Sequence, residues 1–500
     1  MQLNRNNLKR ANAGTAVPGY DRAPLQSRIL HFGFGAFHRA HQALYQDRLL
    51  QLEGGGWGIC VVNLRSAGLL ESLRAQDHLF TVLEQGAEGN QARVIGSVTE
   101  SLHPRLDSPA AVIAKLADPQ LAIVSITLTE KGYCINPATG RLDWDNPDIL
   151  RDLAEPGQPV SLIGYIVAGL AKRQALGLAG VSVMSCDNIP DNGRVIRQAV
   201  LDLASRRDPM LAAWIEREVS FPSTMVDRIV PAVTADTRRE LRDTLGLDDA
   251  CGVATEPFTQ WVIEDDFVAG RPAWEKVGVE LVRDVRPFEA MKLRMLNGTH
   301  SFLAYLGYLA GYEYVSDCMA DPVFAQAARR LMLDEQGVTL SMPEQEALTA
   351  YGERLLARFR NPCLRHRTWQ IAMDGTMKLP QRLLAPIRQQ LAEGRPWPLS
   401  ALAVAGWMHY VGGVDEQGNA IDVRDPLCDS LASLVQAAGD DEALVRRLIG
   451  LESVFGSDLS GNEGFVGGIL PAYRRLKQRG AALAVADTLS LRQGDNDVRR

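Results

Sequence analysis

The sequence predicts an α/β protein, with an N-terminal Rossmann-like doubly wound domain followed by a mostly α-helical C-terminal domain. In the first half, short apolar runs alternate with glycine turns and helical patterns, as in a parallel sheet with crossover helices. From about residue 285, helical patterns follow one another with few candidate strands. The 500 residues are too many for one ordinary core. We therefore expect domains at 1–283 and 284–500, with the transition in VELVRDVRPFEAMK.

Composition and charge indicate a globular protein that binds neither nucleic acid nor membrane. Hydrophobic residues make up 46% of the chain and the net charge is −7, without a basic stripe for nucleic acid. The N-terminus has no apolar signal-peptide core, and no uncharged apolar run reaches the length of about 18 residues that spans a membrane. The seven cysteines are dispersed and include no CxxC pair. This usage fits reduced thiols, so we expect a cytoplasmic protein without a zinc cluster.

A strand, a glycine turn and a helix near the N-terminus predict a dinucleotide site. Ile29 to Phe32 is a short apolar run, and GFGAFH (33–38) opens a helical pattern that reaches Leu50. The first glycine allows a tight turn, and the second lets the backbone approach a pyrophosphate at the helix N-terminus. The expected cofactor contacts are Gly33, Gly35, Ala36, Phe37 and Arg39. Such turns also occur without a ligand, and His38, Arg39 and His41 could instead bind a metal, although no further ligands accompany them.

The second predicted strand leaves the choice between NAD and NADP open. It reads WGICVVNL, from Trp57 to Leu64. A dinucleotide fold usually places an acidic residue at the end of this strand, where it holds the adenosine ribose. Here Asn63 and Arg65 stand at that end, and no carboxylate follows before Glu71. We count Asn63 and Arg65 among the cofactor contacts, and an arginine at this place could accept a 2′-phosphate.

Two further apolar runs end in polar residues that should lie at the same edge of the sheet. They span 121–128 and 178–184, and a crossover helix is expected between them over 160–176. The first run leads into Thr129 and Glu130, and the second into SCDN, which ends at Asn188. Ligands bind at the carboxyl ends of parallel strands, so both loops are candidates for cofactor or substrate binding. A turn or cap role for Asn188 is equally compatible with its residue type.

Charged residues are interleaved with apolar ones in TMVDRIVP (224–231) and EPFTQWVIEDDF (256–267). This pattern is typical of a sheet end or a domain seam. From the residues alone, a structural ion pair between Asp227 and Arg228 is the preferred interpretation.

The helical half contains one run with an unusual set of polar residues. Helical patterns are expected over 290–312, 321–333, 344–359, 378–393, 398–411, 441–454 and 464–478. The first holds Lys292, Asn297 and His300 in MKLRMLNGTHSFLAYLGYL, and at about 100° per residue all three fall on one side of an α-helix. A cation, an amide and an imidazole on an apolar face are costly unless they are paired or used. A snorkelling lysine and a hydrogen-bonded core histidine are the structural alternative.

A second segment of the helical half, RHRTWQIAMDGTMKLPQR (365–382), is rich in cations. It holds Arg365, His366, Arg367, Lys378 and Arg382. Cations near a cleft could bind a carboxylate. They could equally form a solvated helix end, and the composition alone favours neither interpretation.

The motifs, taken in order, resemble those of the polyol-specific long-chain dehydrogenases, the mannitol dehydrogenase family. They are GFGAFHRAH, TEKGYC, SCDN, MVDRIVP, EPFTQWVIED, GRPAWEKVGV and MKLRMLNGTHSFLAYLG. The resemblance covers essentially the whole chain, and its most specific part is K-x4-N-x2-H, formed by Lys292, Asn297 and His300. NPCLRHRTWQIAMDGTMKLPQR and GVDEQGNAIDV resemble the mannonate oxidoreductases (fructuronate reductases) within that family. Gln370 stands where mannitol 2-dehydrogenases are expected to carry an arginine, which argues against mannitol as the best substrate.

The resemblance implies a metal-independent active site between the two domains. By position, Lys292 is the general acid/base, Asn188 and Asn297 bind the oxyanion, His300 orients the substrate, and Glu289 passes protons to solvent. Asp227, Gln370 and Lys378 line the substrate pocket. The implied cofactor is NAD, with NADP not excluded, and the implied substrate is a linear sugar acid or polyol. The family includes monomers, and nothing in the sequence demands an interface.

The expected chemistry explains these residue types. Without a metal, a lysine whose pKa is lowered by burial can accept the hydroxyl proton, while two amide donors stabilise the developing alkoxide. Mannonate at C5 has the stereochemistry of mannitol at C2, so one site could process both. A cation at the far end would select the carboxylate, and we expect Arg367, Lys378 or Arg382 there, with Lys378 the first choice.

Three functional hypotheses remain after the sequence analysis. The first is an NAD-dependent oxidoreductase that interconverts D-mannonate and D-fructuronate. The alternative enzyme is a mannitol 2-dehydrogenase or a dehydrogenase of arabinitol or another polyol. A catalytically silent nucleotide sensor is a hypothesis of another class, and the intact set of Lys292, Asn297, His300 and Asn188 argues against it.

Overall fold

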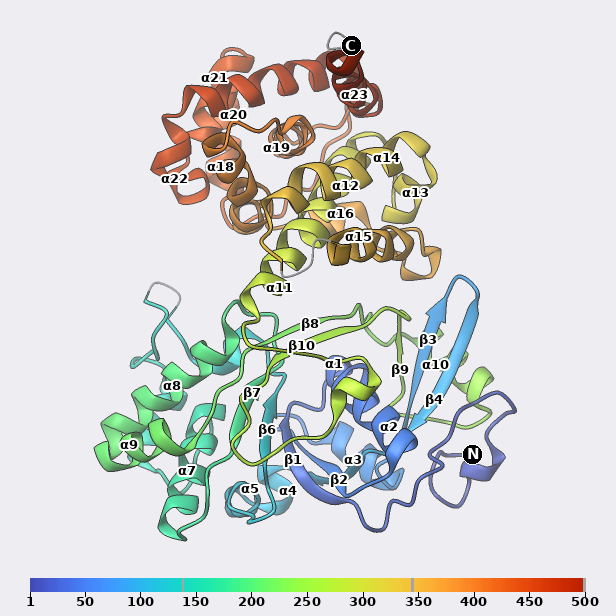
Figure 1. The fold of residues 1–500 in the computed structure, drawn as a ribbon, viewed down its shortest axis with the longest axis vertical. Helices are drawn as coiled ribbons and strands as arrows, with labels where there is room; N and C mark the ends of the chain where they lie inside the picture. The colour runs from blue at the N-terminus through green and yellow to red at the C-terminus, as the bar shows by residue number, and fades with distance from the viewer. Residues whose placement is uncertain (137–138, 343–345, 498–500) are drawn as a thin grey trace. The chain divides into compact units, whose positions relative to one another are not determined.

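The chain forms two compact units, Met1–Arg286 and Pro287–Arg500 (Figure 1). The structure, a computed structural model, describes residues 1–136, 139–342 and 346–497, without the side chains of 130–131, 346–347 and 492–497. The division falls close to the expected domain boundary, and each unit is described by itself below. Among the described helices, none combines the length and the apolar composition that a membrane crossing needs.

A five-stranded sheet forms the centre of the first unit, with the order β5-β2-β1-β6-β7. Its strands are β1 (Gln26–Phe32), β2 (Trp57–Val62), β5 (Val98–Leu102), β6 (Ile123–Ile126) and β7 (Ser182–Ser185). Every neighbouring pair is parallel. The chain runs outward from β1 through β2 to β5 and then returns to the other side of β1 with β6. This order confirms the predicted doubly wound domain, and it places the switch point between β1 and β6, where such folds bind ligands.

Both faces of this sheet are buried, which explains why its strands are near-continuous apolar runs. Leu30 and Phe32 of β1 pack into one hydrophobic cluster, together with residues of α5, α7, α8 and α9. Ile29 faces the opposite cluster, which includes residues of α2 and α3. The helices of this unit are α1 (Ala36–Ala40), α2 (Gln42–Glu53), α3 (Gly68–Ala75), α4 (Pro104–Asp107), α5 (Pro109–Leu116), α6 (Pro147–Ala154), α7 (Leu162–Ala175), α8 (Asn192–Arg207), α9 (Pro209–Glu218) and α10 (Ala235–Leu245).

Two smaller three-stranded sheets complete the first unit, with the orders β4-β3-β9 and β11-β10-β8. Their strands are β3 (Phe80–Gly86), β4 (Gly89–Ile95), β9 (Val253–Thr255), β8 (Thr224–Asp227), β10 (Gln260–Glu264) and β11 (Glu280–Val282). The β3–β4 hairpin was not predicted from the sequence. Asp227 is the last residue of β8, so the TMVDRIVP motif does lie at a strand end.

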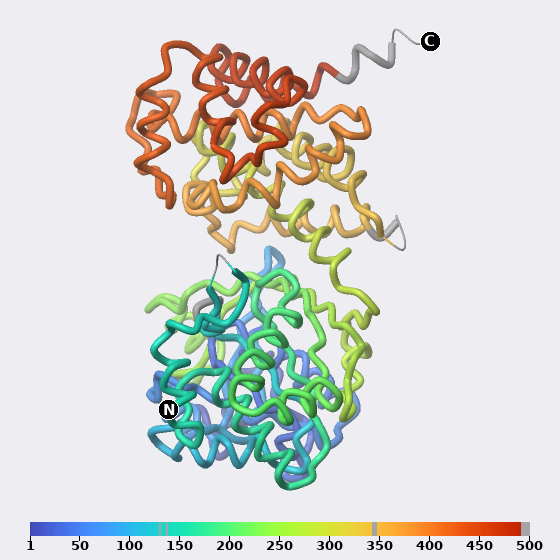
Figure 2. Tube along the Cα trace, turned by 90° about the vertical axis from the view of Figure 1, so that its left-hand side faces the viewer, coloured from blue at the N-terminus to red at the C-terminus, as the bar shows by residue number. Residues whose placement is uncertain are grey.

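The second unit is helical, and its described residues contain isolated bridges but no strand (yellow to red in Figure 2). Its core includes α12 (Thr299–Leu309) and α19 (Pro398–Tyr410), which pack against each other and against α23 (Glu463–Asp497). Almost every residue of α19 is buried, as expected for a helix that is apolar all round. The helices are α13 (Val315–Ala320), α14 (Pro322–Arg330), α15 (Glu346–Phe359), α16 (Thr368–Ala372), α17 (Gly375–Leu379), α18 (Ala385–Ala392), α19 (Pro398–Tyr410), α20 (Cys428–Gln436), α21 (Asp441–Ile449), α22 (Glu452–Ser460) and α23 (Glu463–Asp497).

The helix expected over 290–312 is not one continuous α-helix. It consists of α11 (Arg286–Met291), the π-helical turn η4 (Lys292–Gly298) and α12 (Thr299–Leu309). Two more π-helical turns, η5 (Leu331–Gln336) and η8 (Pro380–Leu384), pack against η4. The 441–454 pattern likewise divides into α21 and α22. Sequence periodicity does not distinguish an α-helix from one with an inserted π turn, because both keep one face apolar.

Candidate functional site

A cavity of about 420 Å³ lies at the carboxyl edge of the large sheet in the first unit. Its walls come from the segments that follow β1, β2 and β6, together with the start of α7. Five predicted cofactor residues line it, namely Gly33, Gly35, Asn63, Arg65 and Thr129. The cavity therefore occupies the switch point of the doubly wound sheet, where a dinucleotide binds in this fold class.

The two glycines of the turn after β1 are needed for different reasons. Gly33 has a φ of +106°, and a Cβ there would lie 2.0 Å from the carbonyl oxygen of Thr127. Only glycine fits this close approach between the turn and β6. Gly35 precedes α1 with a φ of −80°, and a Cβ there would meet nothing within 4 Å. The open space beside Gly35 borders the cavity, where its contact with a phosphate stays a prediction.

Asn63 and His31 hold this turn in place from either side. The Phe34 backbone N–H donates to Oδ1 of Asn63 at 2.8 Å, which ties the turn to the end of β2. His31 lies beneath the turn, where its Nε2 is 3.0 Å from the Gly33 carbonyl oxygen and its Nδ1 is 2.8 Å from Oγ of Ser125. Burial lowers the pKa of His31 to about 3, so the ring is neutral at physiological pH. The role of His31 was not predicted from the sequence.

Arg39 does not line the cavity, although the sequence placed it near the phosphates. It is 6% exposed, and its guanidinium donates to the carbonyl oxygens of Gly35 and Cys251 and lies over the Phe34 ring. Arg39 therefore links α1 to the segment before β9 through hydrogen bonds. Ala36 and Phe37 belong to the first turn of α1 and are also absent from the lining, and the side chain of Glu130 is outside the described residues.

The three histidines near this turn form a packed group. The rings of His31 and His38 stack with centroids 3.6 Å apart, and Nε2 of His41 donates a hydrogen bond to the Gln260 carbonyl oxygen at 3.0 Å. Burial lowers the pKa of His38 well below its usual range. Among the described residues, no three His, Cys, Asp or Glu side chains gather as a metal-ion site would require. Metal independence of the reaction stays a prediction.

Asp187, which the sequence analysis did not single out, organises the loop after β6. Its carboxylate accepts the backbone N–H groups of Leu128 and Thr129 at 3.0 Å each and the Tyr133 hydroxyl at 2.7 Å. Thr129 has a φ of +66°, a conformation that a side-chain-bearing residue rarely adopts without such support. Burial raises the pKa of Tyr133, which keeps its hydroxyl protonated as a donor. Asp187 thus fixes one wall of the cavity from the end of β7.

The loop that carries Asn188 is tied to the strand that carries Asp227. The side chain of Asn192 donates to the carbonyl oxygens of Asp187 and Thr224, and its Oδ1 accepts the Thr224 N–H at 2.9 Å. Asn188 is exposed, whereas Asp227 is 6% exposed. The first unit therefore holds Asn188, predicted to bind the oxyanion, and Asp227, predicted to line the substrate pocket, on two segments that are joined by hydrogen bonds.

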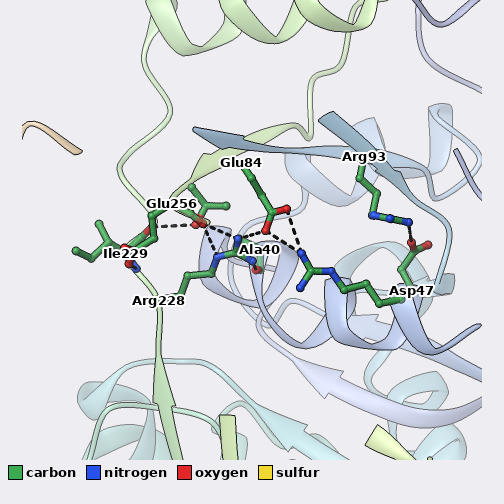
Figure 3. Close-up of polar contacts among 9 residues, drawn as sticks. Ala40, Asp47, Glu84, Arg93, Arg228, Ile229 and Glu256 are labelled. Carbon is green, nitrogen blue, oxygen red and sulfur yellow. Dashed lines mark hydrogen bonds and ion pairs between the residues drawn. The ribbon is translucent and has the colours of Figure 1, made fainter. Parts of the chain in front are cut away.

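Arg228 is the centre of a buried polar network (Figure 3). The structure pairs its guanidinium with Glu84 of β3, and the ion pair with Asp227 that the sequence suggested stays a prediction. Arg228 also donates to the carbonyl oxygens of Ala40 and Glu256 at 2.6 Å each, and Glu84 accepts from Arg48 at 3.0 Å. Such pairing is what a buried guanidinium requires. The network connects the end of α1 with the end of β8, which is the strand of Asp227.

In the second unit, the K-x4-N-x2-H motif lies on the π-helical turn η4 and the start of α12. Lys292 is 8% exposed and His300 is 7% exposed, while Asn297 and Glu289 are half-buried. A π turn bonds residue i to residue i+5, so it brings Lys292 and Asn297 nearer to one face than the expected α-helix would. A Cβ at Gly298 would lie 2.8 Å from the Arg382 carbonyl oxygen. Gly298 is therefore the residue that allows η4 and η8 to pack this closely.

His300 is buried against two aromatic side chains. Its ring centroid lies 4.4 Å from that of Phe359 and 5.3 Å from that of His366. Burial, and then the proximity of His366, Arg358 and Arg382, lowers the pKa of His300 well below its usual range. Arg382 also donates to Oγ of Ser301 at 3.4 Å, next to His300 in the chain.

The other predicted substrate residues of this unit are placed differently. The Lys378 ammonium donates to the carbonyl oxygens of Met373 and Ile371 at 2.5 and 3.2 Å, and burial followed by the nearby Arg382 charge lowers its pKa. Arg367 is exposed and pairs with Glu313 at 3.6 Å. Gln370 is exposed on α16. Lys378, the first choice for a carboxylate, is therefore already engaged with two backbone oxygens.

Comparison with known proteins agrees with the two-part architecture. Residues 27–276 match the family model of the mannitol dehydrogenase Rossmann domain, and residues 284–477 match that of the mannitol dehydrogenase C-terminal domain. The chain belongs to the mannitol dehydrogenase family. As a member of that family, it is an oxidoreductase that acts on CH–OH donors.

Individual relatives in the mannitol dehydrogenase family match over nearly the full chain. The oxidoreductase YeiQ of Escherichia coli K12, described as uncharacterized, is 57% identical over 95% of this chain and 97% of its own. The D-mannonate oxidoreductase of the same organism is 55% identical over 95% of this chain and 98% of its own. Among solved structures, mannitol 2-dehydrogenase of Pseudomonas fluorescens, a ternary complex with NAD and D-mannitol, is 40% identical with a TM-score of 0.81, covering 98% of this chain and 100% of that one.

Proposed function

We propose that this protein is an NAD-dependent, metal-independent oxidoreductase of a linear sugar acid, and that it interconverts D-mannonate and D-fructuronate. The observation that carries the proposal is the placement of Lys292, Asn297 and His300 together on the π turn η4 and the start of α12, with Lys292 and His300 buried. The 55% identity to a D-mannonate oxidoreductase supports the same substrate. The proposed domains remain 1–283 for the nucleotide and 284–500 for the substrate and catalysis.

The proposed roles divide the reaction among this chain's own residues. Lys292 takes the hydroxyl proton when the alcohol is oxidised and returns it when the ketone is reduced, and Glu289 exchanges that proton with solvent. Asn188 and Asn297 donate hydrogen bonds to the oxygen on which negative charge develops, where each such donor is typically worth about 3 kcal/mol. His300 orients the substrate, and Asp227, Gln370 and Lys378 line its pocket.

A nicotinamide nucleotide fits the cavity of the first unit, and when bound it supplies or accepts the hydride. Gly33, Gly35, Asn63, Arg65 and Thr129 line that cavity, and the similar mannitol 2-dehydrogenase was solved with NAD. We favour NAD over NADP. Arg65 pairs with Asp148 at 3.8 Å, so its charge already has a partner in the absence of a 2′-phosphate. We also propose that the protein is cytoplasmic, since all seven cysteines are free thiols. A monomeric state stays an expectation from the family.

A polyol dehydrogenase is the second candidate function, because mannitol 2-dehydrogenase is 40% identical to this chain. Reduction rates with D-fructuronate, D-tagaturonate and D-fructose, each with NADH and with NADPH, separate the two. We expect kcat/KM to be highest for D-fructuronate with NADH. Faster reduction of D-fructose would favour the polyol dehydrogenase, and a preference for NADPH would reject the cofactor assignment. The absence of turnover with every keto sugar would instead favour the hypothesis of a catalytically silent nucleotide sensor.

A further inference from the structure

The cavity of the first unit is lined by a carboxylate that does not come from the segment after β2. That segment supplies the polar residues Asn63, Arg65 and Ser66 to the lining, and none of them is acidic. The next carboxylate along the chain, Glu71, is exposed on α3 and does not line the cavity. Among the described residues of the lining, Asp148 in the first turn of α6 is the only acidic one. The acidic side chain at this cavity therefore comes from a distant helix.

Asp148 has a defined position, because hydrogen bonds hold α6 near both of its ends. At the start of the helix, the backbone N–H of Asp148 donates to Oδ1 of Asn146 at 3.0 Å. Further along, the Asp152 carboxylate accepts the N–H groups of Val160 and Ser161 at 2.7 and 3.2 Å. Val160 and Ser161 line the cavity as well. The helix that carries Asp148 is thus tied directly to the wall of the cavity.

Asp148 forms an ion pair with Arg65, which follows β2. The carboxylate and the guanidinium are 3.8 Å apart, and the two side chains are 43% and 88% exposed. An ion pair this exposed contributes little to stability, so a bound ligand can rearrange it easily. The backbone of Arg65 stays in place, because Arg105 donates to the Arg65 carbonyl oxygen at 2.9 Å. Both charges therefore lie beside the end of β2, where this class of fold holds the adenosine ribose.

A carboxylate and a guanidinium at this place favour different nucleotides. The ribose of NAD has a free 2′-hydroxyl group that can donate to a carboxylate, whereas the 2′-phosphate of NADP is repelled by a carboxylate and attracted by a guanidinium. We propose that Asp148 replaces the acidic residue that is missing after β2, accepts a hydrogen bond from the adenosine ribose of NAD, and makes the protein select NAD over NADP. This inference rests on the proposed binding of a nicotinamide nucleotide in the cavity.

The test measures the binding of NADH and NADPH without a sugar substrate, by fluorescence and calorimetric titration, so it does not depend on turnover. Asp148→Asn keeps the size of the side chain and removes its charge. We expect this variant to bind NADH about tenfold more weakly, as loss of a hydrogen bond to a charged group would cause. It should bind NADPH about tenfold more tightly, because the repulsion is gone and Arg65 is released. Adding Arg65→Gln should abolish the gain for NADPH and keep the loss for NADH.

Asp145→Asn is the matched control, because Asp145 is an exposed carboxylate just before α6 that does not line the cavity. It should bind both nucleotides like the wild type. Equal shifts in the Asp145 and Asp148 variants would mean a general effect of charge and overturn the role of Asp148. If the wild type prefers NADH and Asp148→Asn keeps that preference, only this inference fails. If the wild type prefers NADPH or binds neither nucleotide, the proposed cofactor and the role of Asp148 fail together.

Discussion

Lys292 is a buried cation, and its proposed role in proton transfer explains why a charged side chain is retained at that position. It is 8% exposed within an apolar run, and a buried ammonium group is retained in a protein only where it is paired or used. It shares the π turn η4 with Asn297, and His300 follows in the next turn. π turns inside α-helices occur frequently at functional sites, because they displace the side chains on one face. The residue types and the local geometry thus favour the same catalytic assignment.

Replacing Lys292 tests this assignment directly. Lys292→Ala should lower kcat with D-fructuronate by about a hundredfold or more, which is the loss typical of a missing general acid/base. Steady-state kinetics measure the effect, and circular dichroism verifies the fold. Lys172→Ala, which removes an exposed lysine of α7, is the control and should keep wild-type turnover. Wild-type turnover in a folded Lys292→Ala protein would remove Lys292 from the mechanism.

At the scale of the element, the turn between β1 and α1 contains two glycines, Gly33 and Gly35, which are needed for different physical reasons. The carbonyl oxygen of Thr127 occupies the space beside Gly33, whereas open space lies beside Gly35. Gly33 is therefore required by the fold and Gly35 by the proposed ligand. The motif GFG predicted the turn, but it did not show which glycine served which purpose.

Alanine substitutions separate these two constraints. Gly33→Ala should lower the free energy of unfolding by at least about 1 kcal/mol, because an alanine at φ +106° is strained even before it meets Thr127. Gly35→Ala should unfold like the wild type yet bind NADH about tenfold more weakly, since its methyl group would occupy the space of a phosphate. Thermal unfolding and fluorescence titration measure the two effects. Unchanged NADH affinity in Gly35→Ala would contradict the phosphate contact.

At the scale of the whole molecule, seven of the histidine rings share a preference for the neutral form. Seven of the eight histidines have a pKa below the usual value, chiefly because burial disfavours the charged ring. The pKa falls to about 3 for His31 and to about 4 for His78 and His366. In the unfolded chain these rings have a pKa of about 6.5. As the pH falls, the unfolded state therefore binds protons at a higher pH than the folded state does.

The stability of the protein should accordingly depend on pH. The histidine contribution is fully present above about pH 6.5 and is lost progressively as the pH falls from there toward about 4. Buried aspartates such as Asp47 and Asp249, whose pKa is raised by burial, act in the opposite direction as they take up protons. Denaturant unfolding between neutral pH and about pH 5 should show the decline, and His78→Gln should make it shallower. A free energy of unfolding that stays constant over this range would contradict the prediction.

Much of the fold and part of the site followed from local pattern. The apolar runs predicted β1, β2, β6 and β7, because strands buried on both faces leave little room for polar residues. Gly33, Gly35, Asn63, Arg65 and Thr129 were predicted from their places after those strands, and they do line the cavity. The β3–β4 hairpin was missed. The pairing of Arg228 with Glu84 was not predicted, since Glu84 is 144 residues away in the sequence.

The sequence by itself determined the class of fold, the family and the residues that carry reactive groups, because these depend on periodicity and on short motifs. Only the tertiary structure decided where those groups lie and which atoms they contact. It turned Arg39 into the core, engaged Lys378 with backbone oxygens, and inserted a π turn beneath Lys292 and Asn297. It also brought the rings of Phe359 and His366 against His300. Burial and charge proximity depend on which distant segments meet, and no local pattern specifies that.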